Sequence, residues 1–427
     1  MPKAKTKPKA KDQAPAENVV TPKQETMALN GDEAVALAVK QSDVDVVAAY
    51  PITPQTIIVE KYSEYVANGE VQTEFVCTES EHSAMAACIA AAATGARTFT
   101  ASASAGLALM HEMLFVASGS RVPIVMAIAN RALSSPLNIN GDQSDSMAER
   151  DAGWIHLYVE NAQETYDTIV QAFRIAEHAD VQLPVIVGLD GFHVSHTLEN
   201  VTVLPDAEIK KFVDERKLPN VVTHEGKTVP FKLDPANPMT MGPMALPNYY
   251  FEFKRQQEEA MKNAFKVIQQ VHDEYATISG RKYGNALMEE YQMADAEIAI
   301  VCIGSVAGTA KTVVDELRAE GVKAGLLRLR VFRPFPALEI RKVLENSKAV
   351  AVMDKSISFG GNGGAVFHEV RHAMYDATAR PLIVDYIYGL GGRDTSPKEI
   401  KHIFNDLHTI AHNKRVDKLV NFVGLRE

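Results

Sequence analysis

Short apolar runs alternate with longer helix-periodic stretches between residues 44 and 189. Val44–Tyr50 carries valine at alternate positions, which predicts a strand, and Pro54–Ala67 follows with its apolar residues on one helical side. Val122–Ala129 is rich in Val and Ile without alternation, which is typical of a strand covered on both faces. The same reasoning predicts the strands Val71–Val76, Arg97–Ser102, Ile155–Val159 and Leu183–Leu189, and the helices Glu79–Thr94, Ala105–Ser118 and Ala162–Ala179. Regular alternation of strands and helices favours a parallel sheet with helices on both faces.

The pattern breaks between about residues 198 and 250, where seven prolines interrupt any periodicity. We interpret this stretch as an irregular connecting arm. Phe251–Ile278 then resumes as a long predicted helix, and Arg281–Met293 is a predicted linker.

A second series of alternating elements begins at Ala296. It predicts the strands Ala296–Ile303, Val322–Arg328, Ala349–Met353 and Leu382–Tyr388, and the helices Val306–Glu320, Ala337–Leu344, Gly364–Tyr375 and Pro397–His412. The predicted fold class is therefore α/β, with two doubly wound parallel-sheet domains. The first covers residues 28–250 with its connecting arm, the long helix and linker cover 251–295, and the second domain covers 296–427.

Residues 1–27 have a different character, because lysine alternates there with Ala, Pro and Thr and apolar residues are almost absent. Such a segment cannot bury enough surface to offset its ordering entropy, so we predict a disordered lysine-rich tail. The whole chain of 427 residues contains 44 Lys and Arg and 54 Asp and Glu, which gives a net charge of -10. This balance argues against a dedicated nucleic-acid binder, which needs a basic surface.

The chain contains three cysteines, at positions 77, 88 and 302, and no CxxC pair. We therefore expect neither an iron–sulfur cluster nor a zinc site held by this chain alone, and no metal-ligating residue is predicted. The longest apolar runs fall far short of the ~20 residues that span a bilayer. Without a hydrophobic signal core at the N-terminus, a reducing cytoplasm is the predicted compartment.

Ligands of an open parallel sheet collect at the carboxyl ends of its strands, so residues just after each strand are the candidates for a site. Thr53 precedes Pro54 in Tyr50–Pro54 and is predicted to cap the next helix, whose N-terminus would suit a bound carboxylate. A plain cap without a ligand is the alternative. Arg131 follows strand Val122–Ala129, and its guanidinium can hold a planar carboxylate by two parallel hydrogen bonds. An interdomain salt bridge is its alternative role.

Glu81 stands in the sequence Thr78-Glu79-Ser80-Glu81, which fits a capping box with Thr78 as the cap. The functional alternative is a partly buried carboxylate that shares a proton with a heterocyclic ring nitrogen. The glycine-rich segment Gly360–Gly364 precedes a helix, but it lacks the Lys-Ser/Thr of a P-loop, so we interpret it as a tight turn.

Together these sites resemble the α subunit of the 2-oxoacid:ferredoxin oxidoreductases, closest to the pyruvate-using members. The matching stretches, in chain order, are Tyr50–Pro54, Glu79–Ala84, Gly95–Ser102, Ala129–Leu133, Gly141–Asp145, Arg330–Pro336 and Tyr388–Gly392. The resemblance runs from about residue 28 to the end. It implies a thiamine-diphosphate pyrimidine-binding-like domain followed by a transketolase C-terminal-like domain.

The resemblance further implies a multi-chain enzyme that converts pyruvate and coenzyme A to acetyl-CoA and CO₂ with ferredoxin as electron acceptor, or runs the reverse synthesis. By this likeness Glu81 is the catalytic and cofactor-binding residue that hydrogen-bonds the aminopyrimidine of thiamine diphosphate, and Thr53 and Arg131 bind the substrate carboxylate. A β subunit would carry the diphosphate and Mg²⁺ anchor, γ and δ (ferredoxin-like) subunits would join it, and the [4Fe–4S] clusters would lie in these partner subunits.

An observation on the residues agrees with a divided site. Thiamine diphosphate is anchored through a metal by Gly-Asp-Gly followed by Asn, and this chain contains no Gly-Asp-Gly. A partner chain is therefore expected to supply that half of the site.

Three alternatives stay open. The substrate of the same reaction could be 2-oxoglutarate, a branched 2-oxoacid or oxalate, although by this resemblance the oxalate-using relatives have arginine at the position of Thr53. The chain could be a non-catalytic scaffold subunit. It could also be a self-contained nucleotide-binding enzyme that uses Gly360–Gly364.

Overall fold

The computed structural model describes residues 22–426. Most of the predicted tail, residues 1–21, lies outside the described residues. Strand β1 (Glu25–Leu29) pairs antiparallel with β8 (Glu199–Val203), so the tail prediction extends too far by three residues. Met27 lies opposite Val201 in this ladder and packs against the core, which explains why the order begins before residue 28.

The first unit is built on a seven-stranded sheet with the strand order β14-β6-β7-β5-β4-β2-β3. All neighbours are parallel except β14, which runs antiparallel to β6 at the edge. Its strands are β2 (Val46–Ala49), β3 (Glu74–Cys77), β4 (Thr98–Ser102), β5 (Ile124–Asn130), β6 (Ile155–Tyr158), β7 (Val185–Asp190) and β14 (Val331–Arg333). The predicted parallel sheet is confirmed.

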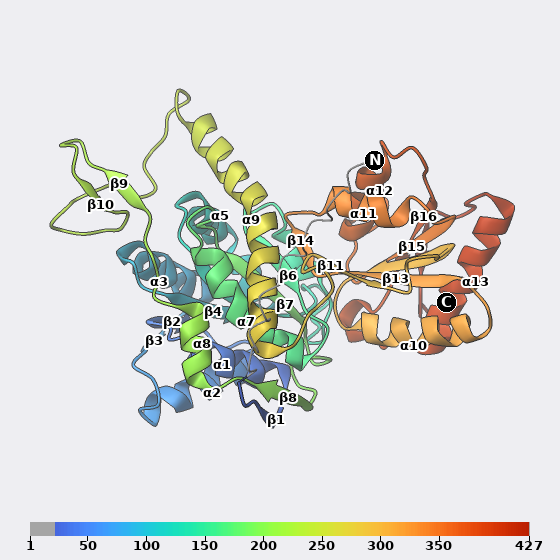
Figure 1. The fold of residues 1–427 in the computed structure, drawn as a ribbon, viewed down its shortest axis with the longest axis horizontal. Helices are drawn as coiled ribbons and strands as arrows, with labels where there is room; N and C mark the ends of the chain where they lie inside the picture. The colour runs from blue at the N-terminus through green and yellow to red at the C-terminus, as the bar shows by residue number, and fades with distance from the viewer. Residues whose placement is uncertain (1–21, 427) are drawn as a thin grey trace, which may run out of the picture.

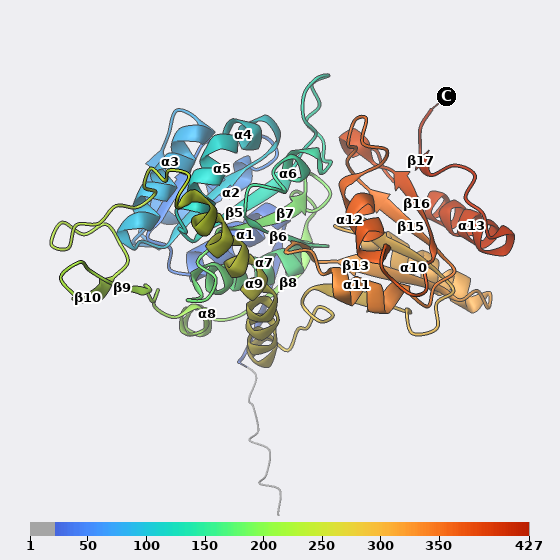
Figure 2. The ribbon, with the colours of Figure 1, turned by 90° about the horizontal axis from the view of Figure 1, so that it is seen from above.

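Helices cover both faces of this sheet (Figures 1 and 2). One face packs against α1 (Gly31–Gln41), α2 (Thr56–Ala67), α7 (Ala162–Glu177), α8 (Asp206–Val213) and the long α9 (Tyr250–Ser279). The other face packs against α3 (Glu81–Thr94), α4 (Ser104–Leu109) and α5 (His111–Gly119), and a short α6 (Ser144–Ala148) follows β5. Because β5 sends alternate residues into both cores, it has no polar face, as its sequence predicts.

Two predicted segments differ from the structure. The helix predicted over 105–118 is divided into α4 and α5 at the buried Met110, whose ψ of -7° departs from the regular helical value. The connecting arm is not irregular throughout: it contains β8, α8 and the hairpin of β9 (Asn220–Val222) and β10 (Thr228–Pro230). The prolines nevertheless separate these elements.

The second unit is a six-stranded sheet with the order β11-β13-β12-β15-β16-β17, parallel except for β11. Its strands are β11 (Met288–Tyr291), β12 (Ile298–Cys302), β13 (Ala324–Leu329), β15 (Ala349–Asp354), β16 (Leu382–Ile387) and β17 (Val420–Phe422). Its helices are α10 (Val306–Ala319) and α13 (Pro397–Asn413) on one face, α11 (Ala337–Leu344) and α12 (Ala365–Met374) on the other, and the short turn η1 (Leu390–Gly392). The predicted fold class, two doubly wound α/β units, is confirmed. The predicted linker contributes β11 to this sheet.

Strand β14 follows β13 of the second sheet in the chain and pairs with β6 of the first sheet (Figure 1). A buried ion cluster also connects the two units. The Arg328 guanidinium contacts the carboxylate of Glu164 at 2.7 Å, and Arg330 contacts the same carboxylate at 2.5 Å. Burial raises the pKa of Glu164, but the two guanidinium groups outweigh burial and lower it to about 2. Glu164 thus fixes the second sheet against helix α7.

We expect Glu164→Gln to destabilise the fold by about 3–5 kcal/mol, because it leaves the buried Arg330 without an acidic partner among the described residues. Arg328 loses one of its three acidic partners and keeps Glu160 and Glu289. Since the pKa of Glu164 is lower in the folded state than its ordinary value of 4.5, the wild-type contribution is complete above about pH 4.5. It is lost as the pH falls toward 2. Denaturant unfolding at pH 7 measures the effect.

The matched control is Glu64→Gln, which removes an exposed ion pair with Lys61. Its expected effect is at most about 1 kcal/mol. Equal, small effects of both substitutions would contradict the role given to Glu164.

Among residues 22–426, no helix combines the length and the apolar character that crossing a bilayer requires.

Candidate active site at the strand carboxyl ends

The candidate residues gather at one edge of the first sheet. Thr53 follows β2, Glu81 follows β3 and Arg131 follows β5, and β4 lies between β5 and β2. These four strands are parallel neighbours, so their carboxyl ends meet at the same edge. The sequence therefore placed its three candidates on a common edge.

Glu81 is the first residue of α3 and only 6% exposed. The predicted capping box is wrong: Ser80 is the cap, because its hydroxyl accepts the Ser83 N–H at 3.2 Å. Glu81 therefore stands one residue after the cap, where it cannot reach back to the cap backbone. Within residues 22–426, no hydrogen bond reaches its carboxylate.

A glycine and a hydroxyl surround the Glu81 carboxylate. A Cβ on Gly106 would lie 2.4 Å from Glu81 Oε1 and 2.7 Å from Ser102 Oγ, so only glycine fits there. The Ser102 hydroxyl is buried and also has no partner among the described residues. The carboxylate of the largely buried Glu81 keeps some contact with solvent, whereas the buried Ser102 hydroxyl without a partner is costly unless a ligand satisfies it. A ring nitrogen such as that of the thiamine aminopyrimidine fits this donor and acceptor set.

Thr53 does not cap α2, contrary to the prediction. The helix begins at Thr56 after Gln55, and no side chain caps it. The buried Gln55 amide instead donates to the Ala101 carbonyl at 2.7 Å, while its backbone N–H bonds the Ile52 carbonyl at 2.8 Å. These bonds hold residues 52–55 in a turn, so Thr53 lies exposed ahead of the helix.

Arg131 and Thr53 are in direct contact. The Arg131 Nη1 donates to the Thr53 carbonyl at 2.9 Å, and its Nε donates to the Asn138 carbonyl at 3.0 Å. Arg131 is 7% exposed and pairs with no acidic side chain among the described residues, so the predicted interdomain salt bridge is not formed there. Two of its five N–H groups are used, and three stay free for an anion.

Sequence reasoning missed Asp145, which lies on α6 and is 1% exposed. Its carboxylate accepts the backbone N–H groups of Arg131 and Ser104, both at 2.9 Å. Burial raises the pKa of Asp145 to about 7, although its hydrogen bonds lower it. The available signal was its place at the end of Gly141–Asp145, a matching stretch to which no role was given.

The second unit borders this edge through its turn η1. The Asn138 amide donates to the Gly391 carbonyl at 3.0 Å, and Asp142 accepts the Gly391 N–H at 3.0 Å. The loop after Arg131 is therefore held between the two sheets.

Gly360–Gly364 does not offer a phosphate cradle. The carboxylate of Asp354 accepts the Val366 and Phe367 N–H groups at the start of α12, and Asp385 accepts that of Gly364. Burial raises the pKa of both acids. Acidic groups already occupy this helix N-terminus, which argues against the nucleotide-binding alternative.

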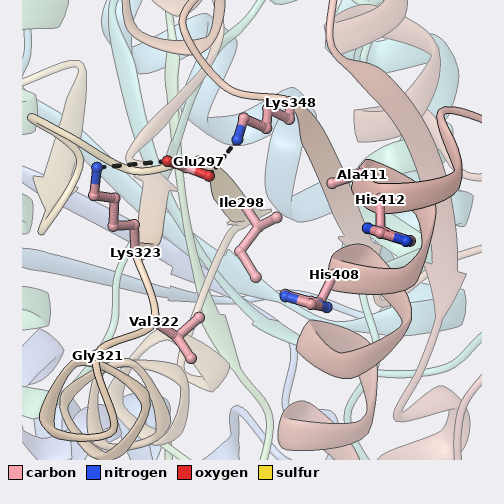
Figure 3. A pocket seen from close by; sticks show the side chains of 9 residues that line it. All are labelled: Glu297, Ile298, Gly321, Val322, Lys323, Lys348, His408, Ala411 and His412. Atoms are coloured by element: carbon pink, nitrogen blue, oxygen red, sulfur yellow. Dashed lines mark hydrogen bonds and ion pairs between the residues drawn. The ribbon is translucent and has the colours of Figure 1, made fainter.

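A cavity of about 370 Å³ lies at the amino ends of strands β12, β13 and β15 of the second sheet (Figure 3). There the Glu297 carboxylate pairs with Lys348 and Lys323, and His408 and His412 lie beside them. Its one carboxylate is neutralised by lysines. Within residues 22–426, no group of three or more His, Cys, Asp or Glu side chains could hold a metal ion.

Comparisons with known proteins agree with the geometry. Residues 37–273 match the family described as pyruvate flavodoxin/ferredoxin oxidoreductase, thiamine diphosphate-binding, and residues 296–400 match pyruvate:ferredoxin oxidoreductase core domain II. The chain is 51% identical over 403 residues to pyruvate synthase subunit PorA of Methanocaldococcus jannaschii, covering 94% of this chain and 99% of the relative. PorA of Thermotoga maritima is 49% identical over 406 residues, covering 94% of this chain and 99% of the relative. The ketoisovalerate oxidoreductase subunit VorA of Pyrococcus horikoshii is 42% identical over 398 residues, which cover 93% of this chain and 98% of the relative.

A solved 2-oxoglutarate:ferredoxin oxidoreductase from Magnetococcus marinus, with 2-oxoglutarate, coenzyme A and succinyl-CoA bound, has the same fold. The TM-score is 0.70 at 20% identity, and the match covers 89% of this chain and 65% of that one. The similarity in sequence extends over nearly the whole chain, and the fold agrees with it. The chain belongs to the pyruvate flavodoxin/ferredoxin oxidoreductase family.

Proposed function

We propose that this chain is the α subunit of a pyruvate:ferredoxin oxidoreductase, which converts pyruvate and coenzyme A to acetyl-CoA and CO₂ and reduces ferredoxin, or catalyses the reverse synthesis. The observation that carries the proposal is the Glu81 side chain, which is 6% exposed, forms no hydrogen bond among the described residues and packs against Gly106 at the carboxyl ends of the strands. The identity to PorA subunits supports pyruvate as substrate.

Glu81 holds a proton at the ring nitrogen of the cofactor aminopyrimidine. When bound, thiamine diphosphate supplies a carbon nucleophile for the 2-oxo group and accepts the electron pair that CO₂ leaves. A buried acid suits this task, because the exclusion of water strengthens its hydrogen bond to the ring. The Ser102 hydroxyl lies within the same space and can satisfy its hydrogen bond there.

Arg131 binds the substrate carboxylate with the N–H groups that Thr53 and Asn138 leave free. The exposed Thr53 side chain adds a hydroxyl to the same position. The two carbonyl contacts fix the direction of the guanidinium before substrate arrives, which reduces the ordering cost of binding.

Partner subunits complete the site. A β subunit carries the diphosphate and Mg²⁺ anchor, γ and δ subunits join it, and iron–sulfur clusters in the partner subunits pass electrons to ferredoxin. Support comes from the sequence, which has no Gly-Asp-Gly and only three widely spaced cysteines. The curated relatives are themselves named as subunits.

A branched 2-oxoacid is the second candidate substrate, because a relative named for ketoisovalerate is 42% identical. The test is a viologen-dye assay of the purified multi-chain complex with coenzyme A and each of pyruvate, 2-oxoisovalerate and 2-oxoglutarate. We expect kcat/KM for pyruvate to exceed the others by roughly 10- to 200-fold, the discrimination typical of a pocket sized for one methyl group. A higher value for either competitor would reassign the substrate.

A further inference from the structure

Asp145 connects two parts of the candidate site that belong to different strands. Its Oδ2 accepts the N–H of Ser104, which begins α4, and the N–H of Arg131, which follows β5. Its Oδ1 accepts the Asn130 side-chain amide at 2.8 Å and the Ser146 N–H at 2.7 Å. One carboxylate therefore holds four donors from three segments.

This carboxylate is buried without a counter-ion among the described residues. Taking an acid out of water costs stability, and an apolar or neutral residue would be cheaper in the core. The four N–H donors offset part of that cost. The position of these four donors is therefore the feature of Asp145 that a residue of similar size without the charge would not reproduce.

The two backbone N–H groups that Asp145 accepts belong to segments that contact Glu81 and Thr53, respectively. Ser104 has a φ of 46°, a left-handed conformation that is unfavourable for a residue with a side chain, and its hydroxyl donates to the Ala132 carbonyl. Two residues later, Gly106 lies against Glu81. On the other side, Arg131 contacts Thr53.

We propose that Asp145 is a positioning residue that fixes the Arg131 clamp and the Ser104–Gly106 turn beside Glu81 relative to one another. It touches neither substrate nor cofactor. The inference rests on the proposed function, because it assigns Arg131 to the substrate carboxylate and Glu81 to the cofactor ring.

The test is Asp145→Asn in the purified multi-chain complex. The asparagine keeps the size, but its NH₂ group faces N–H donors, so some of the four contacts are lost. Displacement of positioned groups by about 1 Å can cost ~10²-fold, so we expect kcat/KM for pyruvate to fall about 10- to 100-fold, with both KM and kcat affected. The control is Asp151→Asn, whose exposed carboxylate lies only near the Arg150 and Arg333 side chains. It should stay within about 3-fold of wild type, because exposed substitutions away from the site have small effects.

A double-mutant cycle separates positioning from simple damage. If Asp145 acts through Arg131, adding Asp145→Asn to Arg131→Lys should raise KM by less than the product of the single effects, because neighbours that share a contact are not additive. Kinetics of Asp145→Asn equal to those of Asp151→Asn, or KM effects that multiply fully, would overturn the proposal.

Should the Asp145→Asn complex fail to assemble, Asn130→Ser gives the second measurement. It removes the Asn130 amide, which donates to Asp145 at 2.8 Å and to the Ser146 hydroxyl at 2.7 Å, and it leaves the backbone contacts of Asp145 in place. We expect kcat/KM to fall about 2- to 10-fold, as for the loss of a buried hydrogen bond. Unchanged kinetics of that variant would refute the inference. If the wild-type complex prefers another 2-oxoacid, pyruvate is wrong as the proposed substrate. The ratios of kcat/KM between variant and wild type, measured with the preferred 2-oxoacid, then still decide the role of Asp145.

Discussion

Glu81→Gln should lower kcat of the assembled complex with pyruvate by about 10²- to 10⁴-fold, the range for loss of one positioned acid–base group. The amide has nearly the size of the acid, so it fits the space that Gly106 leaves open and keeps the fold. What it loses is the ability to hold a proton at the ring nitrogen of the cofactor. KM for pyruvate should change little, because the substrate carboxylate is assigned to Arg131.

The matched control is Glu79→Gln, two residues earlier. Glu79 is exposed, and its carboxylate accepts only the Ser83 hydroxyl among the described residues, so activity should stay at the wild-type level. Calorimetric binding of thiamine diphosphate to the apo-complex gives a readout independent of turnover, and weaker binding by Glu81→Gln alone is expected. A Glu81→Gln complex with wild-type kcat would leave this residue without a catalytic role.

The sequence was informative wherever a pattern is local. A strand such as β5 has both faces buried, so its unbroken Val and Ile content predicts it without knowledge of its neighbours. The position of Thr53, Glu81 and Arg131 after their strands follows from the same parallel topology. The edge that carries the site could therefore be predicted before the order of the strands was known.

Predictions failed where a contact distant in the chain decides the local structure. The Gln55 side chain bonds a carbonyl 46 residues away, and this bond holds a turn where Pro54 predicted the first residue of a helix. The start of α3 fits two caps almost equally, and the choice of Ser80 over Thr78 turns Glu81 from a capping residue into an unpartnered acid. Neither decision is visible in local spacing.

Asp145 was missed for a related reason. Its partners Ser104 and Arg131 lie 41 and 14 residues away in the sequence. The groups that they donate are backbone N–H groups, which every residue except proline has, so the residue types do not indicate the contact. A buried acid in a short helix has no periodicity to mark it. Its importance follows only from the strand order, which brings the ends of β4 and β5 side by side.

Arg131→Lys should raise KM for pyruvate about 10- to 150-fold, which corresponds to the ~1.5–3 kcal/mol of one charged hydrogen bond. The structure explains why retaining the charge is not sufficient. The arginine uses Nε and Nη1 for the carbonyls of Asn138 and Thr53 and keeps three N–H groups free. A lysine has three N–H groups on a single atom, so it cannot reach both carbonyls and still offer a two-point contact to a carboxylate.

The same substitution separates binding from architecture. If Arg131 only holds the loop at Asn138 against Thr53, the lysine variant should lower the melting temperature or weaken subunit assembly while KM stays normal. If Arg131 binds the substrate, KM should rise in complexes that assemble fully and melt near the wild-type temperature. Both quantities should therefore be measured on one preparation. A normal KM with a lowered melting temperature would assign Arg131 to the loop, and the free N–H groups would then have no substrate to bind.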